Sequence, residues 1–89
     1  MEILKVASNT NVAKLAGAIA GIVEDGKSAE LRAVGAGAVN TAMKSLAVAR
    51  GYVAPKGMEL VCAPGFLLYE ENGAPRTLIR LIISDMNRR

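Results

Sequence analysis

The chain lacks histidine and tryptophan and has a single cysteine, Cys62, among its 89 residues. Without histidine the sequence is missing the commonest general base and the usual metal ligand. One cysteine cannot form an internal disulfide, nor, without histidine, a zinc site. These absences predict a non-enzymatic protein with no metal and no cofactor, and the unpaired Cys62 suits a reducing compartment, the cytoplasm.

Aromatic residues make up only 3% of the chain, and no apolar run approaches the roughly 18 residues of a membrane span. The opening MEILKV alternates like a strand and has neither region of a signal peptide, so we expect no leader and no membrane partner. Hydrophobic residues still make up 52% of the sequence, which favours a packed core over disorder. We expect one domain over residues 1–84, followed by a short polar tail over residues 85–89.

Two segments have the spacing of amphipathic helices. From Val12, apolar residues recur at intervals of three and four until the stop signal at Glu24-Asp25-Gly26. The second helix is expected over residues 38–50 and is ended by Gly51. Its predicted buried face consists of Val39, Ala42, Met43, Leu46 and Ala47.

Strand patterns occupy residues 2–7, 29–34, 58–69 and 77–84, and Asn72-Gly73 is a strong hairpin signal between the last two. Pro64-Gly65 predicts a bulge or bend within the third strand. The order β-α-β-α-β-β predicts an α/β two-layer (α+β) fold, a four-stranded mixed sheet with both helices on one face. Alternation in the last strand assigns Arg76 and Arg80 to the open face.

A short strand passes through Gly35-Ala36-Gly37 directly into the second helix. Such a turn allows close approach of the backbone to phosphate, to RNA, to a second chain or to the neighbouring strand. A dinucleotide fingerprint would need a third glycine where Asn40 stands and an acidic residue at the end of the next strand. We therefore do not expect a dinucleotide site.

The segments KVASNTNVAKLAGAIAGIV, AVGAGAVNTAMKSLAVARGYVAP and LIRLII resemble the stage V sporulation protein S family, over residues 1–84. The resemblance implies an Alba-like fold and a regulatory role related to sporulation. Alba-type relatives are dimers that bind DNA or RNA through three segments: the loop before the first helix, the turn that opens the second helix, and a hairpin arm. This sequence departs from their pattern, because its Gly35 turn has no positive charge and its arm, expected to be short, carries Glu70 and Glu71.

Residues Ser8 to Asn11, followed by Lys14, are the strongest candidate for anion binding, since an exposed helix N-terminus offers free N–H groups and a partial positive charge. The alternative is that Asn11 or Thr10 only caps the helix and Lys14 points into water. The net charge of +3 is compatible with a nucleic-acid partner. The predicted contacts are Ser8, Asn9, Asn11, Lys14, Gly35, Gly37, Asn40, Lys44 and Arg76.

A second hypothesis is a protein-interaction scaffold without a nucleic-acid role. It rests on the uncharged surface predicted around residues 35–43 and on the apolar stretch from Phe66 to Tyr69. Under either hypothesis we expect a homo-oligomer, a dimer or larger, because a chain this short buries a limited share of its apolar surface.

Overall fold

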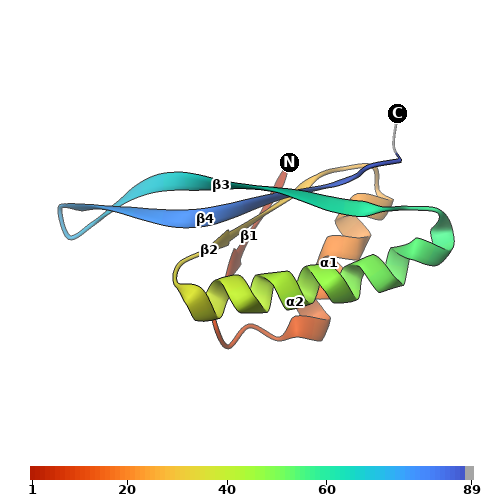
Figure 1. Cartoon of the computed structure of the whole chain (residues 1–89), viewed down its shortest axis with the longest axis horizontal. Coiled ribbons are helices and arrows are strands. Elements are labelled where there is room, and N and C mark those ends of the chain that lie inside the picture. Colours follow the sequence, from red (N-terminus) through yellow and green to blue (C-terminus); the bar gives the residue numbers. More distant parts are fainter. Residues whose placement is uncertain (88–89) are drawn as a thin grey trace.

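Residues 1–87, described by a computed structural model, form a four-stranded sheet with two helices on one face (Figure 1). The predicted order β-α-β-α-β-β is confirmed. The strands are β1 (Glu2–Val6), β2 (Ala29–Ala33), β3 (Leu60–Glu71) and β4 (Ala74–Asp85). The helices are α1 (Val12–Glu24) and α2 (Ala36–Val53), and a short 3-10 turn, η1 (Ala54–Lys56), follows α2.

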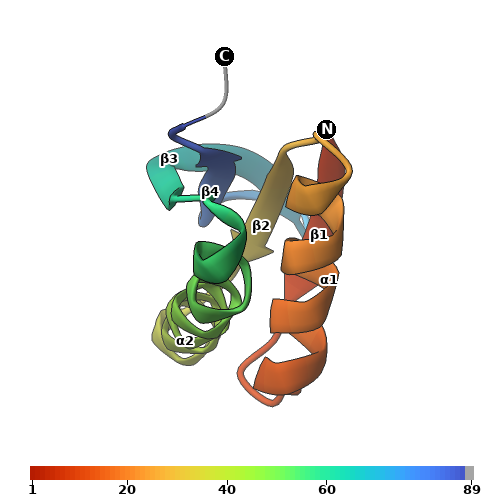
Figure 2. The same ribbon diagram turned by 90° about the vertical axis from the view of Figure 1, so that its right-hand side faces the viewer.

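The sheet is mixed, with the strand order β1-β2-β4-β3. β1 and β2 run parallel, whereas β4 runs antiparallel to both of its neighbours, β2 and β3. Viewed along the sheet, α1 and α2 lie side by side on the same face (Figure 2). No helix formed by residues 1–87 lies over the other face of the sheet, as the sequence predicts. Within residues 1–87, neither helix combines the length and apolar character that crossing a membrane requires.

The core lies between the sheet and the helices and is built mainly from aliphatic and alanine side chains. Ile19 of α1, Leu31 of β2 and Ile83 of β4 are its largest fully buried apolar members besides Val53. Ala16, Ala29, Ala42 and Ala49 are also fully buried. Small side chains allow the two layers to approach closely, so the core is closed without any buried aromatic residue among those described.

Helix α2 is longer than predicted and buries a different face. Gly51 does not end α2, which continues to Val53. Gly57, a glycine in the left-handed conformation at φ 80°, ends the 3-10 turn η1. A helical glycine costs only about 1 kcal/mol relative to alanine, and the full burial of Val53 offsets that cost. The predicted end of α2 before Gly51 is wrong, because one glycine within a helix costs less than the burial of Val53 stabilises.

Thr41 and Ser45 are buried in α2, whereas Met43 and Ala47, which we placed in the core, are exposed. Both hydroxyls donate hydrogen bonds to backbone oxygens, Thr41 to Ser8 O at 2.9 Å and Ser45 to Thr41 O at 2.8 Å. A hydroxyl satisfied in this way can be buried at little cost. The buried stripe is consequently rotated relative to the one that hydrophobicity alone predicts.

β3 is continuous, and the predicted bulge at Pro64-Gly65 is wrong. Pro64 pairs in register with Leu81, and Gly65 pairs with Arg80. β3 is an edge strand, where alternate N–H groups face away from the sheet, so a proline is tolerated there.

The β3–β4 hairpin is not short. β2 reaches only as far as the pairing of Ala33 with Ile79, and beyond it residues 67–78 form a two-stranded ribbon that projects from the body (Figure 1). We call this ribbon the hairpin arm. Its turn is the predicted Asn72-Gly73, with φ values of 52° and 79°, which is the geometry of a two-residue hairpin loop.

Candidate nucleic-acid interface

The loop of residues 7–11 is shaped by its own side chains. The Thr10 hydroxyl accepts a hydrogen bond from the Ala7 N–H at 2.8 Å, and Asn11 Oδ1 accepts one from the Lys14 N–H at 2.9 Å. Asn11 is therefore the N-cap of α1, as the capping alternative predicts. The cap fixes the path of the loop, and it leaves the side chain of Lys14 exposed in the first turn of a helix that has no acidic residue there.

The turn that opens α2 depends on glycine. Gly35 lies at φ 90° and ψ 160°, a backbone conformation that other residues rarely adopt, and it is an N-cap without a side-chain hydrogen bond. The first turn of α2 also carries no acidic residue. The N-terminus of α2 therefore presents its backbone N–H groups with neither a capping side chain nor a neutralising charge.

Two segments that are far apart in the sequence meet at Ser8. A Cβ atom built on Gly37 would lie 3.0 Å from Ser8 Cβ, which is too close for any side chain to be accommodated without a shift. The hydrogen bond from Thr41 to Ser8 O lies one turn further along α2. These contacts fasten the loop of residues 7–11, which leads into α1, to the first turns of α2.

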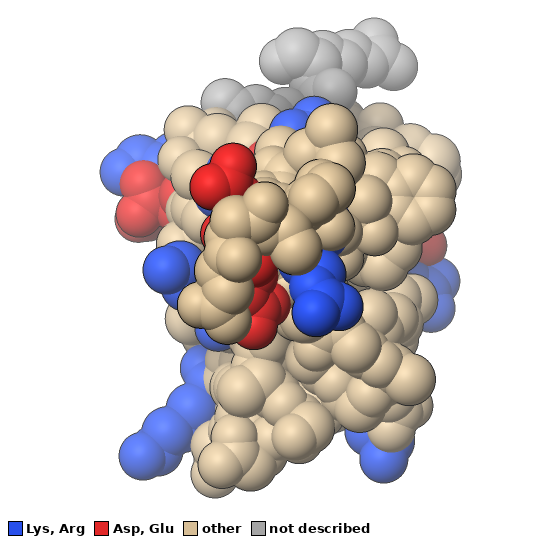
Figure 3. Space-filling model, turned by 90° about the vertical axis from the view of Figure 1, so that its left-hand side faces the viewer, with Lys and Arg blue, Asp and Glu red and all other residues tan. Residues whose placement is uncertain are grey.

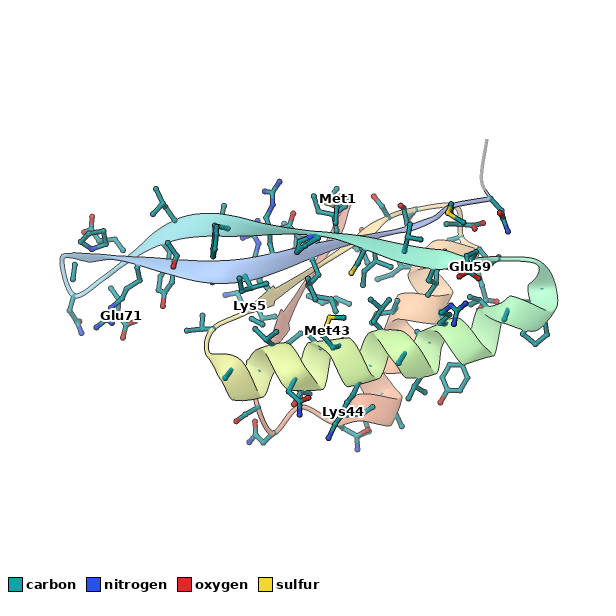
Figure 4. All side chains as sticks on the ribbon, in the orientation of Figure 1. Met1, Lys5, Met43, Lys44, Glu59 and Glu71 are labelled. Atoms are coloured by element: carbon teal, nitrogen blue, oxygen red, sulfur yellow. The ribbon has the colours of Figure 1, made fainter. Side chains whose placement is uncertain are left out.

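An open groove of about 640 Å³ separates the first turns of α2 from the root of the hairpin arm. Gly35, Asn40 and Met43 line it from α2, and Phe66 and Thr77 line it from the hairpin. In Figure 4, Met43 points from α2 toward the sheet and Lys44 points away from it. We call residues 5–14, residues 35–44 and the hairpin arm together the arm end.

A family model of stage V sporulation protein S matches residues 2–86, which include every helix and strand of the fold. The chain belongs to the stage V sporulation protein S family. The resemblance noted in the sequence is thereby confirmed, and with it the relation to sporulation proteins. In this SpoVS-family chain, the three segments that the resemblance singles out all lie at the arm end.

Four cations at the arm end of the SpoVS-family chain have no ion pair with any residue in the range 1–87. Lys14 and Lys44 stand on the helix side, and Lys5 and Arg76 stand on the side of the open sheet face. Figure 3, which looks onto this end, shows the basic groups apart from one another, with other residues between them. The charge is therefore spread over the arm end instead of forming one continuous patch.

The predicted contacts fall into three groups. Ser8, Asn9, Asn11 and Lys14 lie in or just after the fastened loop, and Gly37 touches it. Gly35 and Asn40 line the groove, one turn before Lys44. Arg76 does not join either group, because it pairs with Tyr69 across the arm, on the face opposite to Phe66 and Thr77.

Sequence reasoning missed Thr41, which ties the loop to α2. The available signal was a hydroxyl residue in an otherwise alanine-rich helix face. Polar residues at such positions are commonly buried when a backbone oxygen accepts their proton.

Proposed function

We propose that this SpoVS-family protein is a non-enzymatic cytoplasmic regulator that binds DNA or RNA through its arm end and acts as a homo-oligomer. The observation that carries the proposal is the contact of Ser8 with Gly37 and Thr41. That contact fastens the loop before α1 to the first turns of α2, and Lys14 of α1 and Lys44 of α2 have no ion pair within residues 1–87. Family membership supports the relation to sporulation, and the structure supplies the candidate surface.

The proposed mechanism is recognition of the phosphate backbone. Free N–H groups at the start of α2 and the partial positive charge of both helix N-termini favour an anion, and Lys14 and Lys44 add two flexible point charges. Contacts of this kind do not read base sequence, and they weaken steeply as salt displaces the protein from phosphate. Glu70 and Glu71 repel phosphate from the tip of the arm, so we expect the phosphate contacts to lie away from that tip.

The test is a fluorescence anisotropy titration of labelled duplex DNA, and of RNA with the same sequence, at low salt. We expect the wild-type protein to bind at least one of them and Lys14→Glu to bind about tenfold more weakly, since a phosphate contact becomes a repulsion. Lys27→Glu is the matched control, because Lys27 is also exposed and has no ion pair within residues 1–87 but follows the other end of α1. The proposal fails if neither nucleic acid binds or if both variants behave like the wild type.

The second candidate, a protein-interaction scaffold, is favoured by one observation. Phe66 and Leu68 project from β3 on its helix-facing side and are 76% and 74% exposed, next to the groove that Met43 lines. Exposed apolar side chains gathered beside a groove are typical of a protein contact surface.

Light scattering after size exclusion tests whether this surface joins subunits. If this surface joins subunits, Phe66→Ser converts an oligomer into monomers, whereas Val48→Ser on the exposed side of α2 leaves the oligomer intact. A wild-type protein that is monomeric at all concentrations contradicts the homo-oligomer.

A further inference from the structure

Three cations stand in one row across the open face of the sheet. Lys5 of β1 pairs in register with Arg32 of β2, and Arg32 pairs in register with Arg80 of β4. Like charges placed directly opposite each other on neighbouring strands destabilise a sheet. The row therefore needs a counter-charge, and within residues 1–87 a single carboxylate forms ion pairs with it.

That counter-charge is Glu30, which is 4% exposed. Its Oε2 lies 2.6 Å from Arg32 Nε, and its Oε1 lies 3.8 Å from Arg80 Nη1. One carboxylate thus holds both guanidinium groups in place while neutralising one of three positive charges. Lys5 has no ion-pair partner within residues 1–87 and remains free to meet another anion.

A pocket of about 510 Å³ adjoins this row, at the root of the hairpin arm. Lys5 and Arg32 line one side of it. The other side is apolar and aromatic, with Leu67, Tyr69 and Leu78 from the arm and Val34 at the end of β2. Figure 4 shows Lys5 close to the point where the arm leaves the sheet. The volume lies within the range of small-molecule sites, and the lining joins an anion-binding half to an apolar half.

We propose that this pocket binds a nucleotide. The phosphate would lie at Lys5 and at the outer edge of the Arg32 guanidinium, a group that binds phosphate through parallel N–H bonds. The base would lie against the Tyr69 ring and the leucine side chains, since aromatic rings stack on any base. An anion at this position also reduces the repulsion among the three cations of the row, and this reduction favours anion binding.

Two ligands present a phosphate together with a base: a free nucleotide and a nucleotide within a single strand. Lys5, Arg32 and Tyr69 line the pocket from the open face of the sheet, whereas Lys14 and Lys44 lie on the helix side. The proposal therefore does not rest on the phosphate contacts proposed for the loop and α2.

The experiment is a calorimetric titration of the full chain with adenosine monophosphate, adenosine, inorganic phosphate and single-stranded oligoadenylate. We expect adenosine monophosphate to bind at least about tenfold more tightly than adenosine or phosphate, because only it occupies both halves of the pocket. Oligoadenylate that binds more tightly than the monophosphate, with the same dependence on Lys5, assigns the pocket to a single strand. Equal or weaker binding assigns it to the free nucleotide.

Three variants at the pocket and three controls away from it localise the site. Lys5→Gln and Tyr69→Ala should each weaken binding of adenosine monophosphate about tenfold, and Tyr69→Phe should restore it, which separates a stacking role from a folding defect. Lys27→Gln and Tyr52→Ala change matching residue types away from the pocket and should have no effect. Lys14→Gln should leave the binding of free adenosine monophosphate unchanged, so a failure at the arm-end loop is distinguishable from a failure here. The proposal is overturned if neither the monophosphate nor oligoadenylate binds, if phosphate alone binds as well, or if Lys5→Gln and Tyr69→Ala bind like the wild type.

Discussion

The two ends of the molecule use their charges differently. At the end opposite the arm, Arg50 is bound to Glu59 through two nitrogens, at 2.7 and 3.0 Å, and Lys56 is bound to Glu24. Hydrogen bonds also join the start of β3 to the end of β4 there: the Glu59 N–H donates to Asp85 Oδ1, and the Met86 N–H donates to Glu59 O. At the arm end, Lys14 and Lys44 have no such partner within residues 1–87. The contrast is between cations that are ion-paired and hold the fold and cations that have no ion pair within residues 1–87.

The most severe test of this comparison reverses two charges at each end. Lys14→Glu combined with Lys44→Glu should weaken nucleic-acid binding roughly a hundredfold at low salt, because two phosphate contacts become repulsive. Lys27→Glu combined with Lys56→Glu changes the net charge equally but at the opposite end, and should weaken binding only a few-fold through the general field. Anisotropy titrations measure both. Equal losses in the two double variants would show that only net charge matters.

Two glycines in α2 should respond oppositely to alanine. Gly37→Ala should lower the free energy of unfolding by about 1 kcal/mol, because the new methyl group meets Ser8 and displaces the fastened loop. Gly51→Ala lies further along the same helix with nothing within 4 Å and should raise the stability by roughly 0.5–1 kcal/mol. Urea unfolding of both variants checks the pair, and a stabilised Gly37→Ala would contradict the close contact.

The hydrogen bond that joins the loop to α2 should contribute to the free energy of unfolding by about as much as Gly37→Ala lowers it. Thr41→Val keeps the shape of the side chain but removes the donor to Ser8 O, and should cost about 1 kcal/mol. Ser45→Ala removes a hydroxyl that bonds only within its own helix and should cost less. Hydrogen exchange adds the local readout: residues 7–11 should exchange faster in Thr41→Val and not in Ser45→Ala.

The smallest expected effect concerns the acids of the arm. Replacing Glu70 and Glu71 with glutamine should tighten nucleic-acid binding a few-fold at low salt, since it removes two repulsive charges from the arm end. Glu2→Gln combined with Asp25→Asn removes the same charge from the opposite end and is the control. Tightening by the control pair alone would contradict the assigned location of the interface.

Most of the fold could be predicted because its signals are local. The period of apolar residues defines α1, alternation assigns Arg80 and Leu81 to opposite faces of β4, and Asn72-Gly73 gives the hairpin turn its geometry. The β-α-β-α-β-β order then restricts the topology to few arrangements. The family match over residues 2–86 agrees with the same reading of the sequence.

What could not be predicted depends on tertiary contacts. The buried face of α2 is decided by a hydrogen bond from Thr41 to a backbone oxygen 33 residues earlier, which no periodicity shows. The length of the arm depends on where β2 stops pairing with β4, and not on the arm itself. The same holds for the candidate interface: its residues were named from the sequence, but the contact of Ser8 with Gly37 that brings two of its segments together is visible only in the fold.

The most direct test of the arm-end interface is the salt dependence of nucleic-acid binding in single neutral variants. The slope of the logarithm of affinity against the logarithm of salt concentration counts the phosphate contacts. In Lys14→Gln and in Lys44→Gln the slope should be smaller in magnitude than that of the wild type by about one each, whereas Lys27→Gln should keep the wild-type slope. Unchanged slopes in both arm-end variants would contradict the account.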